Sequence, residues 1–220
     1  MKNNNNAFWR KASAVFDERA REYDQWFESS LLFRIELQAL EQLRTPLAAP
    51  KFEVGIGPGR FAEQLGVRFG IDPARAPLLL AGKRGCAVCQ AIGGMLPVRD
   101  RTLGTVFLLF TLCFMDCPET VLAECYRVLR PGGHLVLGMV PAQSSWGKML
   151  TAKKEQGHPF YRYARFHEPE QVRQQLVESG FTLTEARSSL QQPPEQLENE
   201  ESSEDGIIPS AGFVVFVGRR

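Results

Sequence analysis

Three glycines within five positions separate a short apolar run from a helical pattern, and this feature most constrains the fold. Gly55, Gly57 and Gly59 lie within the stretch FEVGIGPGRFAEQL, residues 52–65. A glycine turn between a strand and a helix lets the backbone approach a ligand that a side chain would displace. The free amides at the start of the following helix favour negatively charged groups. The stretch therefore predicts a strand–turn–helix unit with a ligand at the turn.

Apolar runs alternate with helical patterns through the middle of the chain, which is typical of a parallel sheet covered on both faces. The expected strands are 51–57, 67–73, 86–92, a long apolar run at 102–114, and 134–140. The expected helices are 59–66, 76–85 and 118–133, the last with Pro118 near its start and Pro-Gly-Gly at its end.

The two ends of the chain have different patterns from its middle. Residues 1–8 contain an asparagine run and are expected to be disordered, and 9–46 have helical spacing. After a helix at 169–180, strands at 181–190 and 211–218 follow without an intervening helix, which indicates an antiparallel hairpin. The acidic stretch 191–205 between them is expected to be a solvated loop.

These patterns predict one α/β domain over residues 1–220, with a doubly wound, mostly parallel seven-stranded sheet of the Rossmann-like type and a C-terminal antiparallel hairpin. Residues 9–46 would form a helical cap, 51–140 the ligand-binding core, and 141–220 the substrate side and the closing hairpin.

Composition narrows the class of protein. A formal net charge of +1 argues against a nucleic-acid binder, which would carry a concentrated basic face. No apolar run reaches the roughly 18 residues of a membrane span, and the N-terminus lacks the apolar core of a signal peptide. Five cysteines, an odd number, fit a reducing compartment, so a cytoplasmic protein is expected.

The residues around the turn indicate which nucleotide binds. Asp72 ends the second expected strand, 17 positions after Gly55, where a carboxylate can accept hydrogen bonds from both ribose hydroxyls. A dinucleotide fingerprint needs a glycine at position 60, which is Arg60, so a nicotinamide cofactor fits poorly. Glu53 precedes the turn, and a carboxylate there favours an ammonium group over a pyrophosphate. S-adenosylmethionine has a ribose, an ammonium and a carboxylate, and it fits this pattern.

At this point the sequence resembles a known family. EVGIGPG, GIDP, Leu96–Pro97 and VLAECYRVLRPGGHLVLG are similar to successive motifs of the class I S-adenosylmethionine-dependent methyltransferases, near the group that includes the quinone-pathway C-methyltransferases. The likeness covers Tyr23 to Gly138 and extends more loosely to the end, through FYRYARFHEPEQVRQQLVESGF.

The resemblance implies roles for the residues of the first two strands. The Gly55–Gly59 turn would line the methionine and ribose, with Glu53 near the ammonium group. Asp72 would hold the ribose diol, and Pro73 would pack beside the adenine. Tyr23, in the N-terminal segment YDQWF, is at a position where a tyrosine often closes over the cofactor in this family.

It implies further cofactor contacts from later segments, with two departures from the family pattern. Gly93 would contact the adenine through its amide, and Thr111 would border the cofactor. Ile92 stands where the family has an acid on the adenine amino group. Leu103–Gly104 replaces a Phe-Asp pair before the fourth strand.

The cysteines raise the alternative of a zinc site. Cys86 and Cys89 form one pair, and Cys113 and Cys117 form another. The expected fold puts the two pairs on strands far apart, and residues three apart on a strand face opposite sides. Buried cysteines acting as small apolar residues are therefore expected, with no metal.

Substrate-side candidates gather in two aromatic segments. Trp26 belongs to the N-terminal helices, and five more candidates lie around the stretch HPFYRYARFH: His158, Tyr161, Tyr163, Arg165 and His167. The alternative is a packed connecting segment. His134, at a strand start, is expected to be structural.

The expected function is methyl transfer from S-adenosylmethionine to a small-molecule nucleophile, with neither nucleic acid nor membrane as a partner. The sequence identifies no catalytic residue, and it leaves the acceptor atom and the oligomeric state open. The Ile92 and Gly104 departures keep open a second possibility, a non-catalytic or regulatory protein that binds S-adenosylmethionine in the same fold.

Overall fold

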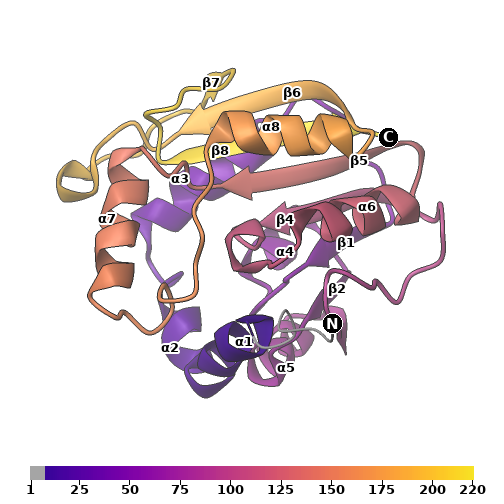
Figure 1. The fold of residues 1–220 in the computed structure, drawn as a ribbon, viewed down its shortest axis with the longest axis horizontal. Helices are drawn as coiled ribbons and strands as arrows, with labels where there is room; N and C mark the ends of the chain where they lie inside the picture. Colours follow the sequence, from indigo (N-terminus) through magenta and orange to yellow (C-terminus); the bar gives the residue numbers. More distant parts are fainter. Residues whose placement is uncertain (1–7) are drawn as a thin grey trace, which may run out of the picture.

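An eight-stranded sheet forms the centre of the computed structural model, which describes residues 8–220 (Figure 1). The strands, in chain order, are β1 (Lys51–Val54), β2 (Phe69–Asp72), β3 (Ala87–Gln90), β4 (Leu103–Leu109), β5 (Leu129–Met139), β6 (Thr182–Ser189), β7 (Glu204–Asp205) and β8 (Phe213–Arg219).

The strand order is β3-β2-β1-β4-β5-β8-β6-β7, and the chain reverses its direction of growth between β1 and β4. β1 to β5 pair in parallel, whereas β8 is antiparallel to both β5 and β6. The mostly parallel sheet with antiparallel C-terminal strands confirms the predicted fold class. In Figure 1 the arrowheads of β4 and β5 point toward the side where α7 and α2 lie.

Helices cover both faces and one edge of this sheet. They are α1 (Phe8–Glu18), α2 (Ala20–Gln25), α3 (Leu31–Glu41), α4 (Arg60–Leu65), α5 (Arg75–Lys83), α6 (Pro118–Val128), α7 (Ser145–Glu155) and α8 (Pro169–Glu178), with short 3₁₀ turns η2 (Leu112–Phe114) and η3 (Pro194–Gln196).

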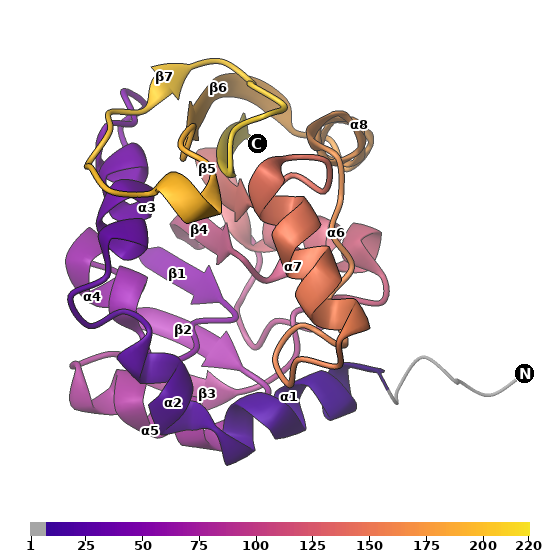
Figure 2. The ribbon, with the colours of Figure 1, turned by 90° about the vertical axis from the view of Figure 1, so that its left-hand side faces the viewer.

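Two apolar cores lie on opposite faces of the sheet, because side chains alternate along each strand. In β4, Val106 and Leu108 join the core formed with α6 and α8, while Phe107 and Leu109 join the core formed with α3, α4 and α5. Figure 2 shows these two groups of helices on either side of the strands. A doubly covered sheet explains why the strands are continuously apolar.

α1 and α2 of the expected helical cap lie over the carboxyl edge of the parallel strands, whereas α3 packs on one face of the sheet. α1 and α2 contact α5, and Asp24 of α2 holds this arrangement through ion pairs. Its carboxylate accepts hydrogen bonds from Arg60 at 2.7 Å and from Arg84 at 2.9 Å, and all three side chains are largely buried. These pairs fasten α2 to the helices that follow β1 and β2.

Several predicted boundaries are wrong, for local reasons. The expected helix 118–133 ends at Val128, because Pro131 cannot continue a helix and its preceding residue favours an extended backbone. The run 102–114 is β4 followed by η2, and the strand at 86–92 is only Ala87–Gln90. Helix α7 was not predicted.

The acidic stretch is also more ordered than predicted, and the sheet has eight strands rather than seven. Glu204 and Asp205 form β7 against β6. Arg187 of β6 binds Asp205 at 2.8 Å and Ser203 Oγ at 2.7 Å, which holds the end of the acidic stretch on the sheet.

Within residues 8–220, no helix is long and apolar enough to cross a membrane. The expectation of disorder at residues 1–8 falls almost entirely outside the described residues.

Candidate active site

Two adjacent cavities lie at the carboxyl edge of the parallel strands. The first cavity, of about 460 Å³, is bordered by the ends of β1, β2 and β4, around the point where the strand order reverses. Ligands of doubly wound sheets bind at this point. The second cavity, of about 340 Å³, lies beside it under α2, α3 and α7. Phe16, Tyr23, Phe110 and Phe114 line both cavities.

The glycine turn leaves open space on the side of the first cavity. Gly57 has a left-handed backbone (φ +52°), and a Cβ there would meet only Tyr23 Cε1, at 3.7 Å. Gly55 (φ +76°) is needed for a different reason, because a Cβ there would lie 2.5 Å from Oγ1 of Thr111, which also lines the cavity. The turn thus presents bare backbone at Gly57 and packs against Thr111 at Gly55.

Gly59 has a structural role in this turn. It caps α4 with φ +81°, and a Cβ there would lie 3.0 Å from Cβ of Ala81 in α5. Gly59 does not line the first cavity. Its lack of a side chain lets the start of α4 approach α5.

Asp72 connects the glycine turn to the end of β2. Its Oδ2 accepts a hydrogen bond from the amide of Gly57 at 3.0 Å, and its Oδ1 accepts one from the amide of Ala74 at 2.8 Å. Burial raises the pKa of Asp72 to about 6, outweighing these two bonds, which lower it. Each carboxylate oxygen has a further lone pair, so both can still accept bonds from a diol in the cavity.

Glu53 is buried in β1 and does not line the first cavity. Its Oε2 has no hydrogen-bond partner among the described residues. Burial, and next the charge of Asp72, raises the pKa of this carboxyl well above its usual range. The predicted contact between Glu53 and an ammonium group remains a prediction.

The far end of the first cavity is bordered by Pro73, Ile92 and Gly93, where the resemblance puts the adenine. Asp116, in the loop before α6, also lines this cavity, and its buried Oδ2 has no partner among the described residues. Its Oδ1 lies 3.5 Å from Nη2 of Arg165. Asp116 was not among the residues predicted from the sequence, and it is an acid that lines the same cavity as Ile92.

These residues fit S-adenosylmethionine. The bare backbone at Gly57 allows close approach, Asp72 can accept hydrogen bonds from the ribose, and the walls around Pro73 and Ile92 suit a flat apolar ring. Asp116 provides a buried oxygen in this cavity that can accept a hydrogen bond from a ring amino group.

Aromatic rings from two segments line part of the second cavity and contact one another. Tyr23 and Trp26 of the cap pack on Phe160, with ring centroids 5.6 Å and 4.7 Å away, and Trp26 stacks on Tyr161 at 6.1 Å. These contacts join the N-terminal helices to the segment between α7 and α8, so the two aromatic segments lie side by side over the strand ends.

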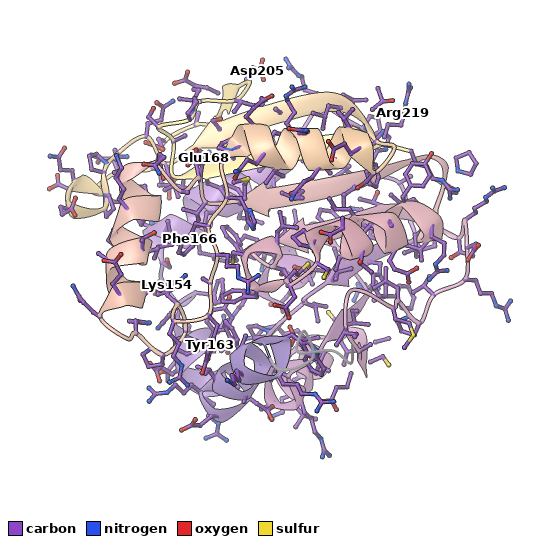
Figure 3. The ribbon with its side chains drawn as sticks, viewed as in Figure 1. Lys154, Tyr163, Phe166, Glu168, Asp205 and Arg219 are labelled. Atoms are coloured by element: carbon purple, nitrogen blue, oxygen red, sulfur yellow. The ribbon has the colours of Figure 1, made fainter. Side chains whose placement is uncertain are left out.

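The substrate-side candidates fall into two groups. Trp26, His158, Tyr161 and His167 line the second cavity, whereas Tyr163 and Arg165 line neither cavity. Figure 3 shows the connecting segment running from Tyr163 near α1, past Phe166, to Glu168, where α8 begins. Lys154 of α7 donates a hydrogen bond to the carbonyl of Ala164 at 2.7 Å and holds the segment in place.

One buried carboxylate in the second cavity was also missed. Glu36 of α3 is 7% exposed and lines the cavity among aromatic side chains. The sequence carries a signal for it, because Glu36 lies four residues from both Leu32 and Leu40, on the apolar stripe of its helix.

The structure gives no support to a zinc site. None of the five cysteines forms a disulfide bond. Cys86 and Cys125 are buried and Cys113 and Cys117 are half-buried, but Cys89 is exposed, contrary to the expectation of buried cysteines. Cys113 lies in η2 and Cys117 caps α6. The prediction that this pair lies on a strand is therefore wrong. Among the described residues, no group of three or more His, Cys, Asp and Glu side chains could hold a metal ion.

A doubly wound sheet with a bare glycine turn and a carboxylate at the end of its second strand defines a Rossmann-like protein that binds a nucleoside cofactor. Comparison with known proteins narrows the class. A family model described as "Methyltransferase domain" matches residues 52–137. A protein of Mycobacterium bovis, described as uncharacterized, is 39% identical over 207 residues, which are 92% of this chain and 73% of that protein.

Two solved structures are similar over nearly the whole chain. One from Thermotoga maritima, described as an S-adenosylmethionine-dependent methyltransferase and a possible histamine N-methyltransferase, has a TM-score of 0.85 and 32% identity, covering 94% of this chain and 98% of that one. The other, the 1,6-didemethyltoxoflavin-N1-methyltransferase of Burkholderia thailandensis with bound S-adenosylhomocysteine, has a TM-score of 0.67 and 15% identity, covering 100% and 92%. The chain belongs to the class I S-adenosylmethionine-dependent methyltransferases, and its cofactor is S-adenosylmethionine.

Proposed function

We propose that this protein transfers the methyl group of S-adenosylmethionine to a small-molecule nucleophile bound in the second cavity. The observation that carries the proposal is the pair of adjacent cavities, which share four lining residues, Tyr23 and three phenylalanines. A cavity of about 340 Å³ is within the usual size range of small-molecule sites.

The cofactor supplies a methyl group already activated by the positive charge of its sulfonium. What remains for the chain is to align the nucleophile and to exclude water. Alignment of two reactants can supply about 7–11 kcal/mol of the barrier. The rings of Trp26, Phe160 and Tyr161 provide the water-excluding cover over the second cavity. A protein base is needed only for a nucleophile that arrives protonated.

The Thermotoga maritima protein favours a nitrogen acceptor among the possible ones, since it is described as a possible histamine N-methyltransferase and is 32% identical. We propose that the acceptor atom in this protein is also nitrogen.

The departure at Gly104 has a structural reason that does not weaken the proposal. A Cβ at Gly104 would lie 2.6 Å from the carbonyl oxygen of Ala49, and the amide of Gly104 donates to the carbonyl of Pro50 at 3.0 Å. Glycine there permits the segment before β1 to pack on β4. The non-catalytic alternative therefore depends mainly on Ile92, and Asp116 offers an acceptor in the same cavity.

We also propose a cytoplasmic protein that acts without nucleic acid or membrane. Five cysteines without a disulfide bond favour a reducing compartment, and the net charge of +1 favours a neutral or small ligand over a polyanion.

The test is transfer of label from methyl-labelled S-adenosylmethionine to a fraction of small metabolites. We expect label in this fraction in proportion to the amount of protein, together with S-adenosylhomocysteine formation. Binding of S-adenosylmethionine without transfer to any fraction would favour the non-catalytic alternative.

A further inference from the structure

Glu36 is a buried acid in the wall of the second cavity, and its carboxylate has no partner among the described residues. Its side chain is 7% exposed and lines this cavity. Within residues 8–220, no hydrogen bond or ion pair joins it to another residue, although α3 itself is well ordered by Ser30, which caps it. Burial of an unpaired carboxyl is costly, so its retention in the wall of a cavity points to a partner that arrives with a ligand.

The walls around Glu36 favour a positive charge. Tyr23, Trp26, Phe33 and Tyr161 line the same cavity. The faces of aromatic rings are electron-rich and attract cations, most strongly where water is excluded. A carboxylate among such rings is a combination that recognises organic ammonium groups.

The histidine and tyrosine side chains that line this cavity do not repel a positively charged ligand. Burial lowers the pKa of His158 and of His167, which keeps both imidazoles neutral at pH 7 and above. Burial raises the pKa of Tyr23 and of Tyr161, which stay neutral as well.

Among the described residues, two more titratable side chains line this cavity, Cys113 and Lys153. Burial raises the pKa of the Cys113 thiol to about 12, so this group is also neutral at pH 7 to 9. Lys153 of α7 borders the cavity but is exposed at its rim, where solvent screens its charge.

We propose that Glu36 is the recognition residue for an ammonium group, and that the acceptor substrate is a small protonated amine with an aromatic or apolar body. This rests on the proposed function and deepens it by naming the substrate class. The ammonium group would bind the Glu36 carboxylate, and the apolar body would pack among the rings of the second cavity. Because an ammonium nitrogen has no lone pair, this nitrogen can accept the methyl group only after its proton passes to the Glu36 carboxylate.

Binding should release a proton. Burial raises the pKa of Glu36 to about 8. A carboxyl with that pKa is about nine-tenths protonated at pH 7 and about one-tenth protonated at pH 9. An ammonium group favours the ionised form, so a carboxyl that is protonated in the free protein must lose its proton when the amine binds. Amine affinity should therefore rise about tenfold from pH 7 to pH 9.

The experiment compares two probes of the same shape, phenethylamine and phenethyl alcohol, by calorimetric titration of the full chain in the presence of S-adenosylhomocysteine. We expect phenethylamine to bind more tightly than the alcohol, with a release of about 0.9 proton per molecule bound at pH 7. The proton count comes from titrations in buffers of different ionisation enthalpy.

The variants are Glu36→Gln and, as a matched control, Glu41→Gln, at an exposed glutamate of the same helix. Glu36→Gln should weaken phenethylamine binding at pH 9 by about 10- to 100-fold and abolish proton release, while leaving the alcohol unaffected. Glu41→Gln should match the wild type. Glutamine has the same shape and needs no proton uptake on folding, so Glu36→Gln should unfold at the wild-type temperature or above.

Equal binding of the two probes, no binding of phenethylamine at pH 9, or an unchanged amine affinity in Glu36→Gln would each overturn the proposal. S-adenosylhomocysteine binding is measured on the same samples. Its absence in the wild type counts against the proposed function. Intact cofactor binding without discrimination between amine and alcohol counts against the role of Glu36 alone.

Discussion

Replacing Asp72 with alanine is expected to weaken S-adenosylhomocysteine binding by about 1.5–3 kcal/mol, or roughly 10- to 100-fold, the usual range for hydrogen bonds to a charged group. The Asp72 carboxylate lines the first cavity and has lone pairs left for a ribose diol. Calorimetric titration of the wild type and the variant measures the difference.

Asp72 also accepts backbone bonds from Gly57 and Ala74, so Asp72→Ala can act through the turn as well as through the ribose. Asp72→Asn separates these effects, because the amide oxygen still accepts one backbone bond while the charge is gone. Thermal unfolding of both variants reports on the turn. Wild-type affinity in both variants would remove the proposed contact with the ribose.

Replacing Gly57 with valine is expected to abolish cofactor binding, with an affinity loss of about 100-fold or more, equivalent to at least about 2.8 kcal/mol. The new side chain would point into the open space where the backbone borders the first cavity. It would also pay the cost of a left-handed backbone, about 1–2 kcal/mol, in folding stability.

Gly66→Val is the matched control. Gly66 ends α4 with φ +67°, and nothing lies within 4 Å of a Cβ placed there. Both variants should lose similar stability in thermal unfolding, but only Gly57→Val should lose S-adenosylhomocysteine binding. Normal binding by a folded Gly57→Val protein would mean that the first cavity is not the cofactor site.

The parts of the site that the sequence predicts are those fixed by local backbone chemistry. The spacing of Gly55, Gly57 and Gly59 requires a turn after a buried strand, and Asp72 follows from the end of the next strand. Both lie where expected because parallel neighbouring strands bring their carboxyl ends to one edge.

The parts that the sequence does not predict depend on contacts between distant segments. From the sequence alone, Gly104 indicates that a functional residue of the family is missing. The structure gives a packing reason for the glycine, because the carbonyl of Ala49 lies against it. β7 forms because Arg187 holds Asp205, 18 residues away. Helix α7 contains Gly147, which lowers helical propensity, and it was missed for that reason.

Glu36 and Asp116 show a different limit. Glu36 interrupts the apolar stripe of its helix, and from the sequence alone it is taken for an irregularity of that stripe. The sequence does not say whether this face of the helix borders a cavity or a packed core. Asp116 lies in a loop whose path over the first cavity depends on the contact between Arg165 and Cys113, where the amide of Arg165 donates to the carbonyl of Cys113 at 2.7 Å.

The most direct test of the central claim is calorimetric titration of the wild-type protein with S-adenosylhomocysteine and, separately, with NADH. A single S-adenosylhomocysteine site per chain with micromolar affinity, and no binding of NADH, is the predicted result, because the turn has bare backbone at Gly57 and Arg60 where a dinucleotide fingerprint needs glycine. Binding of NADH in place of S-adenosylhomocysteine, or of neither, would contradict the account.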